Sequence, residues 1–182
     1  VRERIIAAAM ELFQTLGYDQ TTVDDIAEKA EVSRATLFNY FPTKDLLLLP
    51  YGLQVFRNQI RPRVTKYLDS EPTAVQAMRF LFANVYQYVM SIPDIERAFK
   101  QEFLRPKEIP APRFADDGLL QSLTEILKYG QTRGEVRADM AVERRARYVG
   151  VLFFSIFYGK VLGLETEDVQ VEIEALLTFV QA

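Results

Sequence analysis

The chain has 182 residues, of which 49% are hydrophobic, so it is long enough to bury a sizeable core in one domain or in a small domain plus a larger one. It contains no histidine and no cysteine, which excludes His-dependent catalytic triads, thiol nucleophiles, zinc fingers and disulfide frameworks. We therefore expect a protein that is not an enzyme, needs no cofactor or metal, and fits a reducing cytoplasm.

No amino-terminal stretch has the pattern of a signal peptide. The longest apolar run, residues 148–164, carries Lys160 and is shorter than the roughly 20 residues that span a bilayer. We expect this run to be a buried helix and the protein to have no membrane partner.

The first predicted helix begins near the amino terminus. Apolar residues recur at spacings of three and four from Ile5 to Leu16, which is typical of an amphipathic helix. Gly17 follows at the position where a helix end favours glycine. This helix is expected to support the segment that comes next.

Residues 21–44, TTVDDIAEKAEVSRATLFNYFPTK, have the pattern of two short helices joined by a tight turn. Thr22 is a suitable N-cap for the first of these two short helices, and Ser33 caps the second. The second helix runs from residue 34 to 41 and must end at Pro42. The segment therefore predicts a helix-turn-helix.

One face of the second helix points away from the core if Leu37 points into it. This face carries a guanidinium fork, an amide, small side chains and aromatic rings, groups suited to base edges and phosphates in a major groove. We expect Thr22 and Lys44 to contact DNA beside it. The face consists of Arg34, Ala35, Thr36, Phe38, Asn39 and Tyr40.

Charge restricts where DNA could bind. Residues 1–45 carry five basic and eight acidic side chains, a net charge of −3, whereas residues 33–44 carry two basic side chains and no acid. A nucleic-acid surface must therefore be local. The alternative is a plain helix corner of an all-α protein, with its polar side in water.

A longer stretch, IIAAAMELFQTLGYDQTTVDDIAEKAEVSRATLFNYFPTKDLLL, resembles the amino-terminal domain of the TetR family of transcriptional regulators. Two departures stand out. The family usually has Gly where this chain has Glu31, which predicts a costlier turn, since Gly adopts a left-handed conformation most easily. The family also commonly has Tyr where this chain has Phe38, so a contact there must be apolar.

The rest of the chain is predicted to be helical as well. A long helix should start at Lys44 and be kinked or broken near Pro50 or Pro62. The segment 105–113 contains three prolines and is predicted to be a loop. Apolar periodicity and caps predict the other helices at 73–92, 93–104, 115–132, 141–162 and 166–181.

We therefore predict an all-α fold of about nine helices. Residues 1–46 would form a three-helix, helix-turn-helix DNA-binding domain, and residues 47–182 a larger helical domain for effector binding and dimerisation. The resemblance implies this division of roles.

The helix predicted at 141–162 is apolar on almost every side, so it must be covered on every side. A second copy of the chain would cover one face, and the resemblance implies that the last two helices pair as a four-helix bundle. A two-fold dimer would hold its recognition helices about 34 Å apart and read a palindromic operator. The residues expected at this interface are Tyr148, Leu152, Phe157, Ile173 and Leu177.

The predicted larger domain is rich in aromatic side chains. Core packing is the default explanation, but the resemblance implies an effector cavity, and aromatic walls suit a small, largely apolar or aromatic molecule. The residues proposed to line it are Phe82, Tyr86, Phe103, Tyr129 and Phe153.

The sequence thus predicts a DNA-binding repressor that an effector releases from its operator. One alternative is a DNA-binding factor without ligand gating. Another is a helical small-molecule carrier or enzyme, although no spacing of carboxylate, Lys, Tyr or Ser residues assembles a catalytic site.

Overall fold

The structure is a computed structural model that describes residues 1–91, 118–161 and 168–181. Within these ranges the secondary structure is helical and no strand occurs, so the predicted all-α class is confirmed. No helix in the described ranges has the length and apolarity that crossing a membrane requires. Two compact units divide the described residues. Residues 1–54 belong, with 89–91, to one unit, and 1–54 are called the head; residues 55–88, 118–161 and 168–181 belong to the other, called the body.

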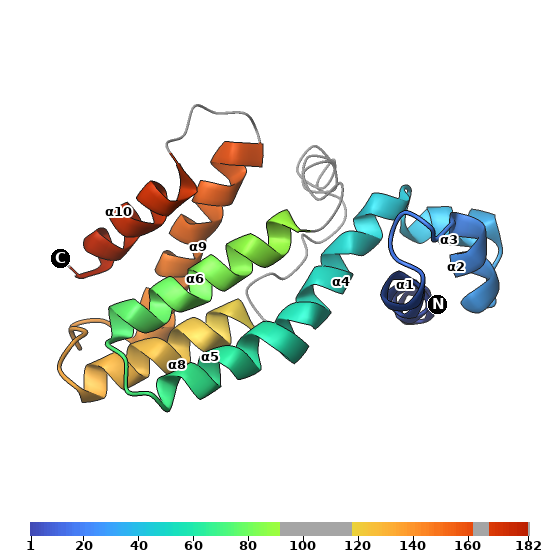
Figure 1. Cartoon of the computed structure of the whole chain (residues 1–182). Coiled ribbons are helices and arrows are strands. Elements are labelled where there is room, and N and C mark those ends of the chain that lie inside the picture. Colours follow the sequence, from blue (N-terminus) through green and yellow to red (C-terminus); the bar gives the residue numbers. More distant parts are fainter. Residues whose placement is uncertain (92–117, 162–167, 182) are drawn as a thin grey trace. The chain divides into compact units, whose positions relative to one another are not determined.

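Three short helices build the head: α1 (Arg2–Thr15), α2 (Val23–Lys29) and α3 (Arg34–Tyr40). Helix α1 packs against α2, and α2 packs against α3 (Figure 1). Their apolar faces meet in a core that includes Ile5, Phe13, Ile26 and Leu37. The predicted arrangement of a supporting helix and a helix-turn-helix is therefore present.

Local caps fix where these helices begin and end. The Thr22 side chain accepts a hydrogen bond from the Asp25 amide, and the Asp25 carboxylate accepts one from the Thr22 amide, which together form a capping box. The Ser33 hydroxyl accepts from the Thr36 amide at 3.0 Å. Gly17 has a φ of +86°, the left-handed conformation predicted at the end of α1.

The next helical stretch runs from the head into the body. Pro50 is tolerated in the first turn of α4, where its missing N–H has no intrahelical acceptor. The helix is irregular directly before Pro62, where five residues are π-helical, because Pro62 cannot donate the usual backbone bond. Near Pro62 the predicted irregularity is a π-helical stretch that runs directly into α5, rather than a break. The stretch comprises η1 (Lys44–Leu47), α4 (Leu48–Val55), η2 (Phe56–Ile60) and α5 (Arg61–Leu68).

Longer helices complete the fold: α6 (Ala74–Met90), α8 (Leu119–Thr132), α9 (Val142–Val161) and α10 (Val169–Gln181). Helix α8 packs against α9 and α5, and α10 packs against α9 (Figure 1). Gly134 has a φ of +73° just past the end of α8. The predicted helix at 93–104 and the predicted loop at 105–113 lie outside the described residues.

Candidate nucleic-acid interface

The outward face of α3 lies where the periodicity placed it. Leu37 is fully buried, whereas Arg34, Ala35 and Asn39 are exposed and Tyr40 is 42% exposed. Thr36 and Phe38 are half-buried at the flanks. The six side chains therefore line the solvent-facing side of one short helix.

A seven-residue helix is too short to be stable alone, so its surroundings must hold α3 in place. Leu37 anchors its inner side in the core of the head. At its amino end the Ser33 and Thr36 hydroxyls lie 2.8 Å apart, in addition to the cap. Helix α3 therefore presents its outer face from a fixed support.

Arg34 is held by a residue that the sequence interpretation did not single out. Its Nη1 donates to both carboxylate oxygens of Asp24, at 2.9 and 2.8 Å. Its guanidinium carbon lies 5.5 Å from the centre of the Phe38 ring. The sequence feature that could have indicated this pair is an acidic residue in the first turn of α2, followed ten residues later by an arginine in the first turn of α3.

Lys44 is part of an internal network. Its Nζ donates to the carbonyl oxygens of Tyr18 and Thr21, at 2.8 and 3.0 Å, and lies 4.0 Å from the centre of the Tyr18 ring. The Tyr18 hydroxyl donates to the buried Asp45 carboxylate. Lys44 therefore ties the loop after α1 to the start of η1, and its charge stays at that end of the head.

Thr22 is exposed, and its hydroxyl donates to the Asp25 carboxylate at 2.7 Å. Hydrogen bonds from the Thr22 side chain and backbone lower the pKa of Asp25. The Thr22 hydroxyl is therefore engaged in the cap of α2 while it faces solvent at the edge of the helix-turn-helix.

The turn between α2 and α3 places Glu31 in a left-handed conformation. Glu31 has a φ of +52°, in the left-handed region that disfavours residues with a side chain. Glu31 thus adopts the conformation that the family's Gly takes most easily, and the helix-turn-helix keeps its fold; the higher cost of the turn stays a prediction.

The residues predicted at a dimer interface fall into two groups. Tyr148 and Leu152 on α9 are 55% and 37% exposed. Ile173 and Leu177 on α10 are each 1% exposed, so their own chain already buries them. The Phe157 side chain lies outside the described residues.

Four of the five residues proposed to line an effector cavity are described, and Phe103 lies outside the described residues. Phe82 and Phe153 are fully buried and stack on each other, with ring centres 4.1 Å apart. Tyr129 is half-buried and donates its hydroxyl to the Pro72 carbonyl at 2.8 Å, and Tyr86 is half-buried. Phe82 and Phe153 thus pack within the described core, and the cavity stays a prediction.

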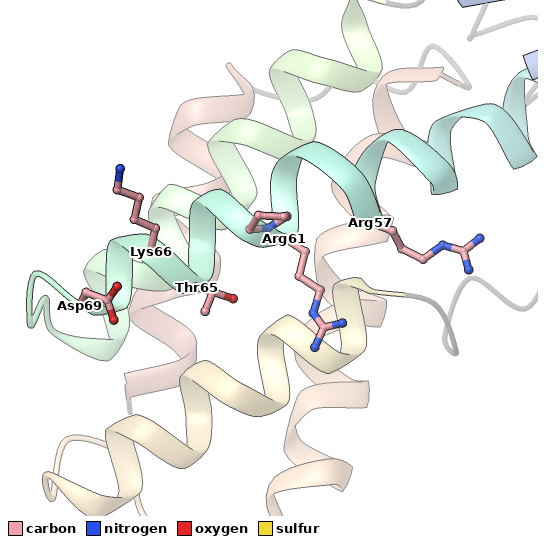
Figure 2. A pocket seen from close by; sticks show the side chains of 6 residues that line it. Arg57, Arg61, Thr65, Lys66 and Asp69 are labelled. Carbon is pink, nitrogen blue, oxygen red and sulfur yellow. The ribbon is translucent and has the colours of Figure 1, made fainter. Parts of the chain in front are cut away.

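The described part of the body carries two open depressions of about 410 and 400 Å³. The first lies along η2 and α5 and is lined by charged side chains (Figure 2). Arg61 extends towards α8, where it pairs with Glu125 at 2.8 Å, whereas Lys66 leaves the opposite side of the helix. Because the charged ends of Arg61 and Lys66 point in different directions, they do not converge on a single bound anion.

Comparison with known proteins points to one family. Residues 5–50 match the family model described as bacterial regulatory proteins, tetR family. A helix-turn-helix-type transcriptional regulator of Bacillus subtilis, YdeS, is 25% identical over 85% of this chain and 75% of its own length.

Solved structures extend the similarity to the whole chain. The FadR of Thermus thermophilus, a TetR-family transcriptional repressor solved with lauroyl-CoA, has a TM-score of 0.72. It is 32% identical, with 99% of this chain and 93% of that chain covered. The FadR of Bacillus subtilis, solved with stearoyl-CoA, shares the fold at a TM-score of 0.63 and 20% identity, covering 100% and 98% of the two chains. The chain therefore belongs to the TetR family of transcriptional regulators.

Proposed function

We propose that the protein is a dimeric repressor that reads a palindromic operator through α3 and leaves it when a fatty acyl-CoA binds the body. The observation that carries the proposal is the face of α3, which is polar and aromatic outside and anchored by the buried Leu37 inside. Because its partner is genomic DNA, we place its action in the cytoplasm.

The face of α3 has the chemistry for direct base readout. Arginine binds the two major-groove acceptors of guanine, and an asparagine amide binds those of adenine. Arg34 and Asn39 are both exposed on this face. Ala35 and the Phe38 ring supply apolar contacts of the kind that a thymine methyl group makes.

The exposed side of α9 supports a dimer. Tyr148 and Leu152 are spaced four residues apart, and Val151 between them is 67% exposed. Val171 and Phe179 on α10 are 49% and 70% exposed. Large apolar side chains in such stripes are costly in water and are buried when two identical faces meet. We propose these exposed residues, rather than Ile173 and Leu177, as the contacts of the dimer.

The proposed effector comes from the similarity to the Thermus FadR, which was solved with lauroyl-CoA and is 32% identical over nearly its whole length. An acyl chain also fits the largely apolar effector predicted from the sequence. A ligand that binds the released conformation better than the DNA-bound one shifts the equilibrium by its differential affinity, commonly about 5- to 150-fold.

Selection of bound sequences from random duplex DNA, with the purified full-length protein, tests the DNA function. We expect enrichment of an inverted repeat whose half-sites are centred about one helical turn, roughly 34 Å, apart. Enrichment of a single half-site would refute the dimeric arrangement, and no enrichment would refute the DNA function.

Two substitutions test the reading face on the selected operator. Arg34→Ala should weaken operator binding by about 1–3 kcal/mol and relax the preference at one base pair. Lys44→Ala should weaken binding to all sequences alike, with a smaller salt dependence. Parent-like binding by both variants would show that α3 is not the reading face.

Release by the effector is tested by titrating lauroyl-CoA into the operator complex and following fluorescence anisotropy. Free laurate and coenzyme A, each added alone, are the matched controls. We expect release by lauroyl-CoA at concentrations where neither control acts. No release by acyl-CoAs of any chain length would leave a DNA-binding factor with another form of control.

A further inference from the structure

The cations of the head are engaged by other groups of the head. Arg4 lies 3.6 Å from Glu31, and Lys29 lies 2.7 Å from Glu11. Lys44 donates to two backbone carbonyls. With residues 1–45 at a net charge of −3, the free head has no surplus of positive charge to attract phosphate.

The pair between Arg34 and Asp24 differs from the other pairs because its cation is on the reading helix α3. The Arg34 and Asp24 side chains are 60% and 65% exposed, so the pair is open to an approaching duplex. The pair is made through Nη1, and a guanidinium has five N–H donors, so the edge formed by Nε and Nη2 is compatible with a base contact.

We propose that Asp24 is a specificity-determining residue that makes Arg34 selective for bases over phosphates. The inference rests on the proposed DNA function. It extends that function, because Asp24 belongs to α2 and lies outside the face of α3.

The physical basis has two parts. A carboxylate 2.8 Å from the guanidinium repels phosphate and offsets the charge of Arg34, which lowers affinity for DNA of any sequence. The same pair, with the Phe38 ring beside it, holds the guanidinium in one orientation. A fixed planar donor loses less freedom when it meets the two acceptors of guanine.

A purely structural role for the pair makes a different prediction. Exposed ion pairs contribute little to stability, and their loss does not alter the preference for one DNA sequence over another. The ratio of affinities for operator and random duplex therefore separates the two roles, since a small change in stability would not move it.

The experiment measures dissociation constants of the full-length protein for the selected operator and for a random duplex across a salt series. Asp24→Asn should bind random DNA about 5- to 10-fold more tightly, lower the operator-to-random ratio about 10-fold, and steepen the salt slope by about one. Circular dichroism confirms that the variant is folded.

Glu11→Gln is the matched control, because it removes the same charge from the pair with Lys29 on the same domain. We expect it to raise affinity for both DNAs alike and to keep the ratio within about twofold of the parent. An equal fall of the ratio in Glu11→Gln and Asp24→Asn would overturn the proposal, since net charge alone would then explain the effect.

A second test asks whether Asp24 acts through Arg34. In an Arg34→Ala background, Asp24→Asn should leave the ratio unchanged, because the group that Asp24 controls is gone. A fall of the ratio in that background as large as in the parent would overturn the proposal. So would a folded Asp24→Asn protein with the parent ratio. A parent protein that enriches no operator would instead refute the DNA function itself.

Discussion

The head and the body differ in the length of their helices. In the head, α2 and α3 have seven residues each, and their amino ends are fixed by hydrogen bonds between side chains and nearby backbone. In the body, α6, α8 and α9 have 17, 14 and 20 residues, and buried apolar side chains hold them together.

This difference has a functional consequence. The caps of the head fix the orientation of a small polar surface, which must meet the edges of bases. The body needs mainly to exclude water between long helices. The total volume of its buried side chains therefore matters more for stability than the identity of each one. Substitutions of buried side chains, in the body or in the head, should therefore cost stability, whereas substitutions on the outer face of α3 should cost DNA binding.

The largest effect is expected from Phe153→Ala in the body. Phe153 is fully buried and stacks on Phe82, so truncation leaves a cavity and should cost about 3–5 kcal/mol of unfolding free energy. Urea unfolding followed by circular dichroism measures the loss. Gln121→Ala, at an exposed position on α8, is the control. Similar losses in both variants would contradict the packing described.

The corresponding change in the head is Leu37→Ala. Leu37 is fully buried beneath the reading face, and its truncation should cost about 2–5 kcal/mol while the body stays folded. Asn39→Ala, two residues away and exposed, should change stability by less than about 0.5 kcal/mol yet weaken operator binding. If Asn39→Ala destabilised the head as much as Leu37→Ala does, the assignment of Leu37 as buried and Asn39 as exposed would be wrong.

A gain of stability is expected from Glu31→Gly in the turn of the head. Glycine adopts the left-handed conformation without a steric cost, so the unfolding free energy should rise by about 0.5–1 kcal/mol. Glu31→Ala also removes the contact with Arg4 but keeps a side chain in the left-handed conformation, so it should not raise the unfolding free energy. A gain in both variants would mean that charge, and not the φ angle, governs the turn.

The smallest effect is expected from Glu174→Gln in the body, where Arg79 on α6 donates to the Glu174 carboxylate on α10 at 2.5 and 2.7 Å. The hydrogen bond from Arg79 lowers the pKa of Glu174. Because both side chains are about half exposed, water screens the pair, and its loss should cost a few tenths of a kcal/mol at pH 7.

The pH dependence of this last effect has a defined sign. A carboxyl group whose pKa is lowered by folding adds stability above its unfolded pKa, about 4.3. That stability is lost as the pH falls through the lowered value in the folded protein. The difference between parent and Glu174→Gln should therefore shrink below about pH 4, as measured by urea unfolding at each pH. A difference that stays constant down to pH 2 would exclude the pair as its cause.

Features that depend on a few neighbouring residues could be predicted from the sequence. The caps at Thr22 and Ser33, the left-handed Gly17 and the inward Leu37 follow from groups within about four positions of one another. Such interactions are fixed by the local backbone, so the order of residues specifies them.

Contacts between groups far apart in the sequence became visible in the folded chain. Asp24 pairs with Arg34, and Lys44 binds carbonyl oxygens more than twenty residues away. Ile173 and Leu177 on α10 are buried by other parts of the same chain. A Cβ on Gly130 would lie 2.6 Å from both Ala74 and Val136, a close approach that periodicity does not predict. These contacts depend on how helices cross, and many packings satisfy the same apolar pattern, so spacing along the chain could not select among them.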